Sequence, residues 1–253
     1  MKNSISSFSQ KLYIVQATGH IMINLAAQIA IFFGILVALV HYYSQRVHKY
    51  HSYHNELLSF AAGISLTYLL LFLLPELYEG VAQLHKLLFL FVLFGAVLFH
   101  VVEKYIYQHK KSKQLIADLS AMHAISFFIY HFLMGVVIVN LLNRDFTLGL
   151  LFFIPILTYS AIGQVSLKEI HAKVTEKKMV RFFLAASTLI GIIEAIIIQI
   201  NPKLFYALLG FVAGAMLYHI MRESIPSEKE GNALFFLLGS IIYTILIVII
   251  WNI

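Results

Sequence analysis

The sequence contains no cysteine, a single tryptophan and few charged residues. Without cysteine the chain has neither a disulfide nor a thiolate metal site. Charged residues make up 12% of the chain and hydrophobic residues 60%, whereas soluble proteins average about 25% charged and about 45–50% apolar residues. This composition excludes an ordinary water-soluble globule and is typical of a polytopic membrane protein.

The apolar residues are grouped in runs of helical length. A helix needs about 20 residues to cross a hydrocarbon core of about 30 Å, whereas strands of a membrane barrel would give alternating segments of about 10 residues. We therefore expect an all-α protein with one transmembrane domain over residues 1–253 and no room for a soluble catalytic domain. The eight expected spans cover residues 21–41, 57–74, 87–102, 119–142, 146–167, 182–200, 204–221 and 233–251.

Two further absences bear on targeting and on chemistry. The first residues show no small-residue cleavage signature after a basic start, so we expect no removable signal peptide. The chain has no paired carboxylates, no His-Glu-x-x-His and no nucleophile beside a base, so we do not expect an enzyme.

The net charge of +6 follows from basic residues that gather in alternate loops. Cytoplasmic loops of membrane proteins carry such an excess, so we expect both termini outside, in a plasma membrane such as the bacterial inner membrane. Anionic headgroups account for the charge without a nucleic-acid partner. The basic residues of these loops are Arg46, Lys49, Lys104, Lys110, Lys111, Lys113, Lys168, Lys173, Lys177, Lys178, Arg181, Arg222 and Lys229.

One stretch of the sequence is repeated. Residues 60–80 and 211–231 align with a constant offset of 151 and share seven identities in 21 positions. Hydrophobicity alone does not explain the shared proline and Glu-Gly, so we interpret the match as an internal repeat. The identical pairs are Phe60/Phe211, Ala62/Ala213, Gly63/Gly214, Leu66/Leu217, Pro75/Pro226, Glu79/Glu230 and Gly80/Gly231.

The two copies fall in the second and seventh expected spans, which run in opposite directions. Inverted repeats are a recurring plan of secondary transporters, with the substrate site where the halves meet. The plan here would be 3+2+3: helices at about 21–105 mirror those at about 182–251, around central helices at about 119–167. The alternative is that the Ala-Gly pairs only allow helices to pack closely, without transport.

Four segments carry a resemblance to a known family. AGISLTYLLLFLLPE, GAVLFHVVEKY and GFVAGAMLYHIMRESIP resemble the second, third and seventh helices of the ZIP divalent metal transporters. Gly191-Ile192-Ile193-Glu194 is similar to a Gly-x-x-Glu of part of the family, whose Glu serves the metal site. The resemblance implies eight helices in a 3+2+3 arrangement, outward termini and metal ion transport, zinc being the ordinary substrate.

The centre of the chain departs from that family. Its fourth helix usually reads His-Asn-x-x-Asp/Glu-Gly, but here Tyr130 replaces the His, His131 the Asn and Met134 the carboxylate. The His/Gln-Glu/Asp-x-Pro-x-Glu of the fifth helix has no counterpart, and the His that often precedes Leu-Leu-Pro-Glu is Phe72. Because zinc needs anionic or imidazole ligands, we expect the ordinary zinc site to be lost. The features left in the fifth span are Pro155, Thr158, Tyr159, Ser160 and Gln164.

A reduced set of candidate site residues remains. Spacings of seven and four residues place His123, Tyr130 and Met134 on one helical face, where they could bind a softer ion, a proton or a polar solute. The alternative is packing: core histidines, a core methionine and a protonated, hydrogen-bonded glutamate. The candidates for the metal site are Glu194, His131, Tyr130, Met134, Gln164 and His123.

Other histidines have simpler interpretations. His48, His51 and His54 follow one another at every third residue and could hold a metal ion on a helix, but an interfacial His/Tyr belt is the favoured interpretation. His100 and His219 lie near span ends, where interfacial placement suffices. Pro155 should bend its helix and free a carbonyl, which would either meet a neighbour or line a cavity.

The function expected from the sequence is a ZIP-like metal cation permease with an altered substrate site. The alternative is a ZIP-like membrane protein that does not transport and acts as a partner or sensor, and fold analogy alone does not decide between them. No cofactor is assigned, although a divalent or soft metal ion is a candidate substrate. Expected partners are the lipid bilayer, a small cation or other small solute and, for a homodimer, a second copy of the chain.

Overall fold

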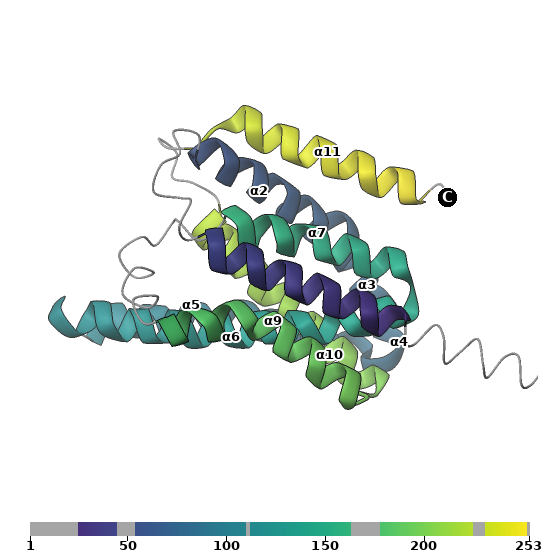
Figure 1. The fold of residues 1–253 in the computed structure, drawn as a ribbon, viewed down its shortest axis with the longest axis horizontal. Helices are drawn as coiled ribbons and strands as arrows, with labels where there is room; N and C mark the ends of the chain where they lie inside the picture. Colours follow the sequence, from purple (N-terminus) through teal and green to yellow (C-terminus); the bar gives the residue numbers. More distant parts are fainter. Residues whose placement is uncertain (1–24, 45–53, 110–111, 163–177, 225–230, 252–253) are drawn as a thin grey trace, which may run out of the picture.

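A computed structural model describes residues 25–44, 54–109, 112–162, 178–224 and 231–251 (Figure 1). These residues are almost entirely helical, and no strand occurs among them. Seven of their helices are long and apolar enough to cross a membrane. The expectation of an all-helical integral membrane protein is therefore confirmed.

The helices follow the expected spans closely. One further apolar helix, α7, corresponds to the expected span at 146–167. Its described part has 17 residues, fewer than the roughly 20 that a span needs, so it is not counted among the seven membrane-spanning helices. The elements in chain order are the Leu25–Ser44 helix, α2 (His54–Tyr68), η2 (Leu69–Leu73), α3 (Leu74–Glu79), α4 (Val81–Leu84), η3 (His85–Leu87), α5 (Leu88–His109), α6 (Ser112–Arg144), α7 (Phe146–Ile162), α9 (Lys178–Ile197), α10 (Pro202–His219), η5 (Ile220–Ser224) and α11 (Ala233–Trp251).

Polar side chains fix where three of these helices begin. Asn201 caps α10: its side-chain oxygen accepts from the Leu204 N–H at 2.9 Å, and Pro202 follows at the first helical position, where it costs no hydrogen bond. Asn232 accepts from the first N–H groups of α11 in the same way. Asp145 accepts from the Thr147 N–H at the start of α7, at 2.6 Å. Each cap satisfies donors that would otherwise be exposed near the apolar phase.

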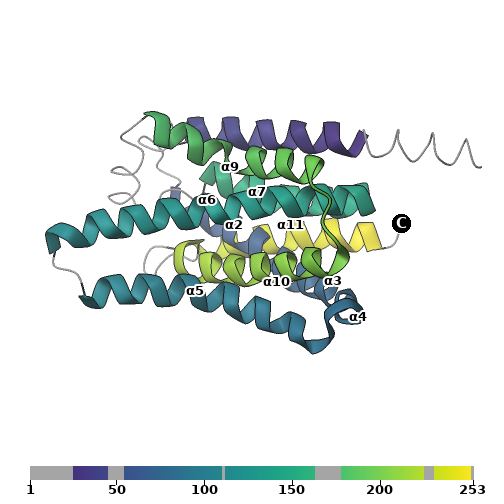
Figure 2. The ribbon, with the colours of Figure 1, turned by 90° about the horizontal axis from the view of Figure 1, so that it is seen from below.

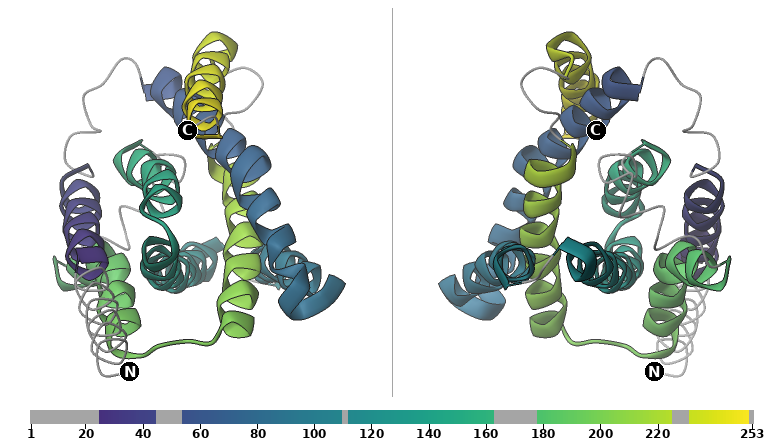
Figure 3. Two further views of the ribbon diagram at one scale, coloured as in Figure 1. Left: turned by 90° about the vertical axis from the view of Figure 1, so that its right-hand side faces the viewer. Right: turned by 90° about the vertical axis from the view of Figure 1, so that its left-hand side faces the viewer.

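Viewed along the bundle, the helices form two groups (Figure 3). The first group contains α2, α5, α10 and α11, and the second contains the Leu25–Ser44 helix, α6, α7 and α9. At one end α5 and α6 extend beyond the other helices (Figure 2). The span within α6 starts only at Ala124, so the segment from Ser112 onward, which includes Lys113, extends past it.

The repeated stretch contains the same irregularity in both copies. A π-helical turn, η2, covers Leu69–Leu73, and a second, η5, covers Ile220–Ser224. The two turns are offset by 151 residues, the offset of the sequence repeat, and each ends two residues before a proline of the sequence. In η2 the Leu74 N–H donates to the carbonyl of Leu69, five residues earlier, rather than to the carbonyl four residues earlier as in an α-helix. The next residue, Pro75, has no N–H to donate. Single π turns of this kind are frequent at functional sites.

The first group of helices is joined by two close crossings. A Cβ atom added to Gly63 of α2 would lie 2.2 Å from the Phe236 carbonyl oxygen of α11, and one added to Gly214 of α10 would lie 1.9 Å from the Val92 oxygen of α5. Gly63 and Gly214 are the glycines that the repeat aligns. The contacts are reciprocal, because Gly239 meets the Phe60 oxygen and Gly95 the Phe211 oxygen. In both crossings the contacts advance in the same direction along the two helices, so equivalent copies make equivalent parallel crossings, and packing through small residues is typical of membrane helices.

The second group has a crossing of the same kind. Gly135 of α6 and Gly191 of α9 each approach a carbonyl of the partner helix, those of Thr188 and Phe132, so that an added Cβ would lie 2.2 Å and 2.0 Å away. The Leu25–Ser44 helix joins this group through Phe33, whose ring stacks on Phe153 of α7 at 3.8 Å between centroids. Each group is thus held by contacts of its own, and a seam runs between them.

Candidate functional site: a cavity on the seam between the helix groups

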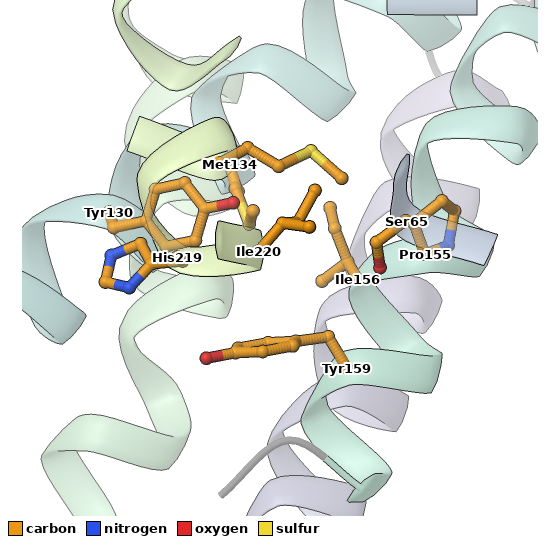
Figure 4. Close-up of a pocket in the computed structure, with 9 residues that line it drawn as sticks. Ser65, Tyr130, Met134, Pro155, Ile156, Tyr159, His219 and Ile220 are labelled. Atoms are coloured by element: carbon orange, nitrogen blue, oxygen red, sulfur yellow. The ribbon is translucent and has the colours of Figure 1, made fainter. Parts of the chain in front are cut away.

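A small cavity lies on this seam (Figure 4). Four helices and one π turn contribute to it, and its volume is ≈ 10 Å³, about the room that one water molecule occupies. None of the side chains around it is a carboxylate, a lysine or an arginine. The lining residues are Ser65, Tyr130, Met134, Pro155, Ile156, Tyr159, Met216, His219 and Ile220.

Helix α6 contributes two of the residues that the sequence singled out. Tyr130 and Met134 are one turn apart, so both face the cavity, and both are buried, with 3% and 2% of their surface exposed. The Tyr130 ring lies 4.8 Å from the ring of His219 on α10, and the two side chains lie together on one side of the cavity (Figure 4). The structure therefore places Tyr130 and Met134 in one site, as their shared helical face predicted.

Helix α7 forms the opposite wall through Pro155 and Tyr159 (Figure 4). Because Pro155 has no N–H, the Leu151 carbonyl one turn earlier lacks its helical donor. The buried Tyr243 hydroxyl of α11 donates to this carbonyl at 2.6 Å. The freed carbonyl therefore meets a neighbour, which is the first of the two outcomes expected for it, while Pro155 itself lines the cavity.

His131, the next candidate, lies to the side of the cavity. It is buried, and its ring packs on Phe127 at 3.8 Å between centroids and lies 6.0 Å from the ring of His41. Its ring is 6.5 Å from that of Tyr159, which does line the cavity. The His131 ring therefore lies between Tyr159, which lines the cavity, and the buried His41.

The remaining candidates are not brought to the cavity. Glu194 lies in the last turn of α9, three residues before that helix ends at Ile197, and is partly exposed. No described residue forms an ion pair or hydrogen bond with its side chain. A position so close to a helix end lets a carboxylate approach the interface, which lowers the cost expected for it from the sequence. Gln164 and the side chain of His123 lie outside the described residues.

The structure also identifies site residues that the sequence argument did not select. His219, for which the sequence suggested only an interfacial position, is buried, with 7% exposed, and lines the cavity. Met216 and Ser65 line it as well. His219 lies in the repeated stretch directly before η5, and this position was the signal available for it. His100, in contrast, is exposed, and His48 and His51 lie outside the described residues.

The donor set decides which chemistry this site can support. Within the part of the chain that is described, no three His, Cys, Asp or Glu side chains are close enough to hold one metal ion. A zinc site with the usual nitrogen and oxygen ligands therefore does not occur in those residues. The cavity offers thioether, imidazole and hydroxyl groups instead.

A second, larger hollow opens at one end of the bundle. It has a volume of ≈ 390 Å³, and its walls include Glu76, Glu79, Asp145 and Trp251. Arg144 neutralises part of this acidity: its guanidinium forms an ion pair with the buried Glu76 and a longer one, at 3.4 Å, with Glu79. This pair joins α3 to the end of α6, across the seam.

No model of a known protein family matches the chain, and no curated protein is similar enough to count as a match.

Proposed function

We propose that the protein is a membrane carrier of ZIP-like architecture that moves a small metal cation along the seam between its two helix groups, through a substrate site altered from that of the family. The observation that carries this proposal is the matched pair of π turns, η2 and η5, which are offset by 151 residues and of which η5 lines the buried cavity through Ile220.

The repeated features support an inverted repeat. α2 and α10 run in opposite directions (Figure 1), each makes its close glycine crossing with a different partner, and each ends in a π turn before a proline. Under the proposal, α2 corresponds to α10, α5 to α11 and the Leu25–Ser44 helix to α9, with α6 and α7 as the central pair. This is the 3+2+3 plan, in which α7 is the eighth span.

The position of the cavity supports transport over a purely structural role. Its walls come from both helix groups, α2 and α10 on one side and α6 and α7 on the other. A relative movement of the groups would open it, and secondary carriers work by rocking one repeat or bundle against another around a fixed site.

The experiment is uptake by proteoliposomes across zinc, manganese, iron and copper. We expect uptake of at least one cation above protein-free liposomes, and zinc uptake well below that of an ordinary ZIP transporter. The resemblance of residues 191–194 to the family's Gly-x-x-Glu still predicts that Glu194→Gln folds and inserts normally but loses uptake or proton coupling, although this carboxylate lies outside the cavity, in the last turn of α9; Glu56→Gln is the control. Zinc uptake equal to an ordinary family member would contradict the altered site, and full activity of a folded Glu194→Gln would remove Glu194 from it. No uptake of any cation would favour the partner or sensor alternative.

The proposed orientation places both termini outside, because helix ends that border the basic loops, the end of α5 and the start of α6, lie at the opposite end of the bundle from the C-terminus (Figure 2). Reporter fusions after Lys113 and Lys178 should therefore score as cytoplasmic, and a fusion after Arg144 as external. An external score at Lys178 would overturn this topology.

A further inference from the structure

We propose that the seam cavity binds a soft monovalent cation, Cu⁺ or its redox-inert analogue Ag⁺, through the thioethers of Met134 and Met216 and the imidazole of His219. The inference rests on the proposed carrier function and names the class of ion that this site takes.

Three soft or borderline donors face one small cavity. Met134 comes from α6, and Met216 and His219 come from α10. All three are buried, with 2%, 5% and 7% of their surface exposed, in a region where ordinary packing would favour leucine over methionine for its better-defined rotamers. Thioether ligands select Cu⁺, and imidazole binds copper well. Met216 and His219 are three residues apart, so they project from one face of α10.

The charge of the lining argues for a single positive charge on the ion. The cavity has no carboxylate among its walls, and within the described residues no cluster of three His, Cys, Asp or Glu exists to replace it. The cost of taking an ion out of water rises with the square of its charge, so neutral ligands compensate a monovalent ion far more readily than a divalent one. Hard divalent ions also prefer carboxylate and carbonyl oxygens over thioethers.

The size of the cavity fits a bare ion. A volume of ≈ 10 Å³ holds about one water molecule, which excludes an ion with its hydration shell but admits a dehydrated Cu⁺. Methionine has three rotatable bonds and a polarizable sulfur, so Met134 and Met216 can close on the ion with little backbone movement. The hydroxyls of Ser65, Tyr130 and Tyr159 border the same space.

The binding test is an anaerobic competition between the purified full chain and a coloured Cu⁺ chelator, bathocuproine disulfonate. The protein should withdraw one Cu⁺ per chain, and excess Zn²⁺ should not displace it. Met134→Leu and Met216→Leu keep the apolar volume and should each lower the affinity at least about tenfold, since even removal of a group that only supports a ligand costs 10–100-fold. The control is Met179→Leu, whose side chain is exposed on α9 and which should bind within about twofold of the unmodified chain.

X-ray absorption at the copper edge provides a readout that does not depend on the variants. It should show sulfur and nitrogen neighbours in the unmodified chain and a loss of the sulfur signal in Met134→Leu/Met216→Leu. A double variant with unchanged affinity, a spectrum without sulfur, or the absence of a one-to-one complex would overturn the inference.

Uptake of Ag⁺ by proteoliposomes in chloride-free buffer separates this inference from the carrier proposal. Ag⁺ uptake that the double variant loses would support both. If the liposomes accumulate a divalent ion and the double variant does so equally fast, the carrier stands and the soft-ion inference is overturned. If the chain binds Cu⁺ through the two methionines but accumulates no cation, the binding site stands and the carrier proposal is overturned.

Discussion

Substitution of Gly214 by alanine is expected to destabilise the protein strongly, while the same substitution at Gly210, one turn earlier on α10, is tolerated. A Cβ on Gly214 would lie 1.9 Å from the Val92 carbonyl oxygen and 2.9 Å from the Ala96 nitrogen. Both are backbone atoms, so the clash cannot be relieved by a rotamer change, and α5 and α10 would have to separate. A Cβ on Gly210 has its nearest neighbours at 3.3 Å, which a small shift accommodates.

Overpacking of a close-packed interior costs about 1–3 kcal/mol and occasionally more. Because the added Cβ would contact two backbone atoms, we expect Gly214→Ala to lie at the upper end of this range. For a domain of this size, 1 kcal/mol corresponds to roughly 2–4 °C in Tm. The measurement is the temperature at which half of the protein, heated in detergent, is no longer monodisperse. This midpoint should fall by about 6–12 °C in Gly214→Ala and by little in Gly210→Ala. Gly63→Ala, at the aligned position of the repeat, should behave like Gly214→Ala. Equal midpoints for Gly214→Ala and Gly210→Ala would show that the α5–α10 crossing is not as close as described.

Replacement of Arg144 by methionine is the second change with a large expected effect. The Arg144 guanidinium forms an ion pair with Glu76, whose side chain is only 8% exposed, and lies 5.7 Å from the Tyr206 ring. Its loss leaves the Glu76 carboxylate buried without that cation. Breaking a fully buried pair costs about 3–5 kcal/mol. Because the Arg144 side chain is 36% exposed, solvent screening lowers the expected cost to about 1–3 kcal/mol.

A double-mutant cycle separates the charge from the packing. Glu76→Gln/Arg144→Met removes both charges, so it should regain most of the stability lost in Arg144→Met alone. Lys203→Met, an exposed change near the same end of the bundle, should leave the midpoint unchanged. If the losses of the two single variants simply add in the double variant, the pair contributes no coupling and the ion pair does not connect α3 to α6.

The positions of the helices were predictable from the sequence because the signal for a membrane span is local. α11 was expected over residues 233–251 and occupies Ala233–Trp251. An apolar segment in a hydrocarbon phase satisfies its backbone hydrogen bonds within itself, and a helix is the simplest way to do so. The repeat was visible for the same reason, because its shared proline is a local feature of the sequence: Pro75 and Pro226 each follow a π turn by two residues.

The site was predictable only in part. Tyr130 and Met134 share a helical face by their spacing alone, and both line the cavity. Glu194, in contrast, was expected among the ligands because a glutamate in an apolar run is costly, but the sequence did not show that α9 would end three residues later. His219 was assigned to the interface by its distance from a span end, whereas the adjacent η5 turn continues the helix and keeps it buried.

The sequence by itself therefore determined the class of protein, the helices and the internal repeat, since each of these depends on residues that are neighbours along the chain. Tertiary structure alone decided which helix faces meet. Met134 and Met216 are 82 residues apart in the sequence and line the same cavity because α6 and α10 lie on opposite sides of one seam. That arrangement needs both the close crossings within each group, such as those of Gly135 with α9 and Gly214 with α5, and contacts between the groups, such as the hydrogen bond from the Tyr243 hydroxyl to the Leu151 carbonyl. Such contacts depend on the shapes of two surfaces at once, and no local pattern in either segment specifies its partner.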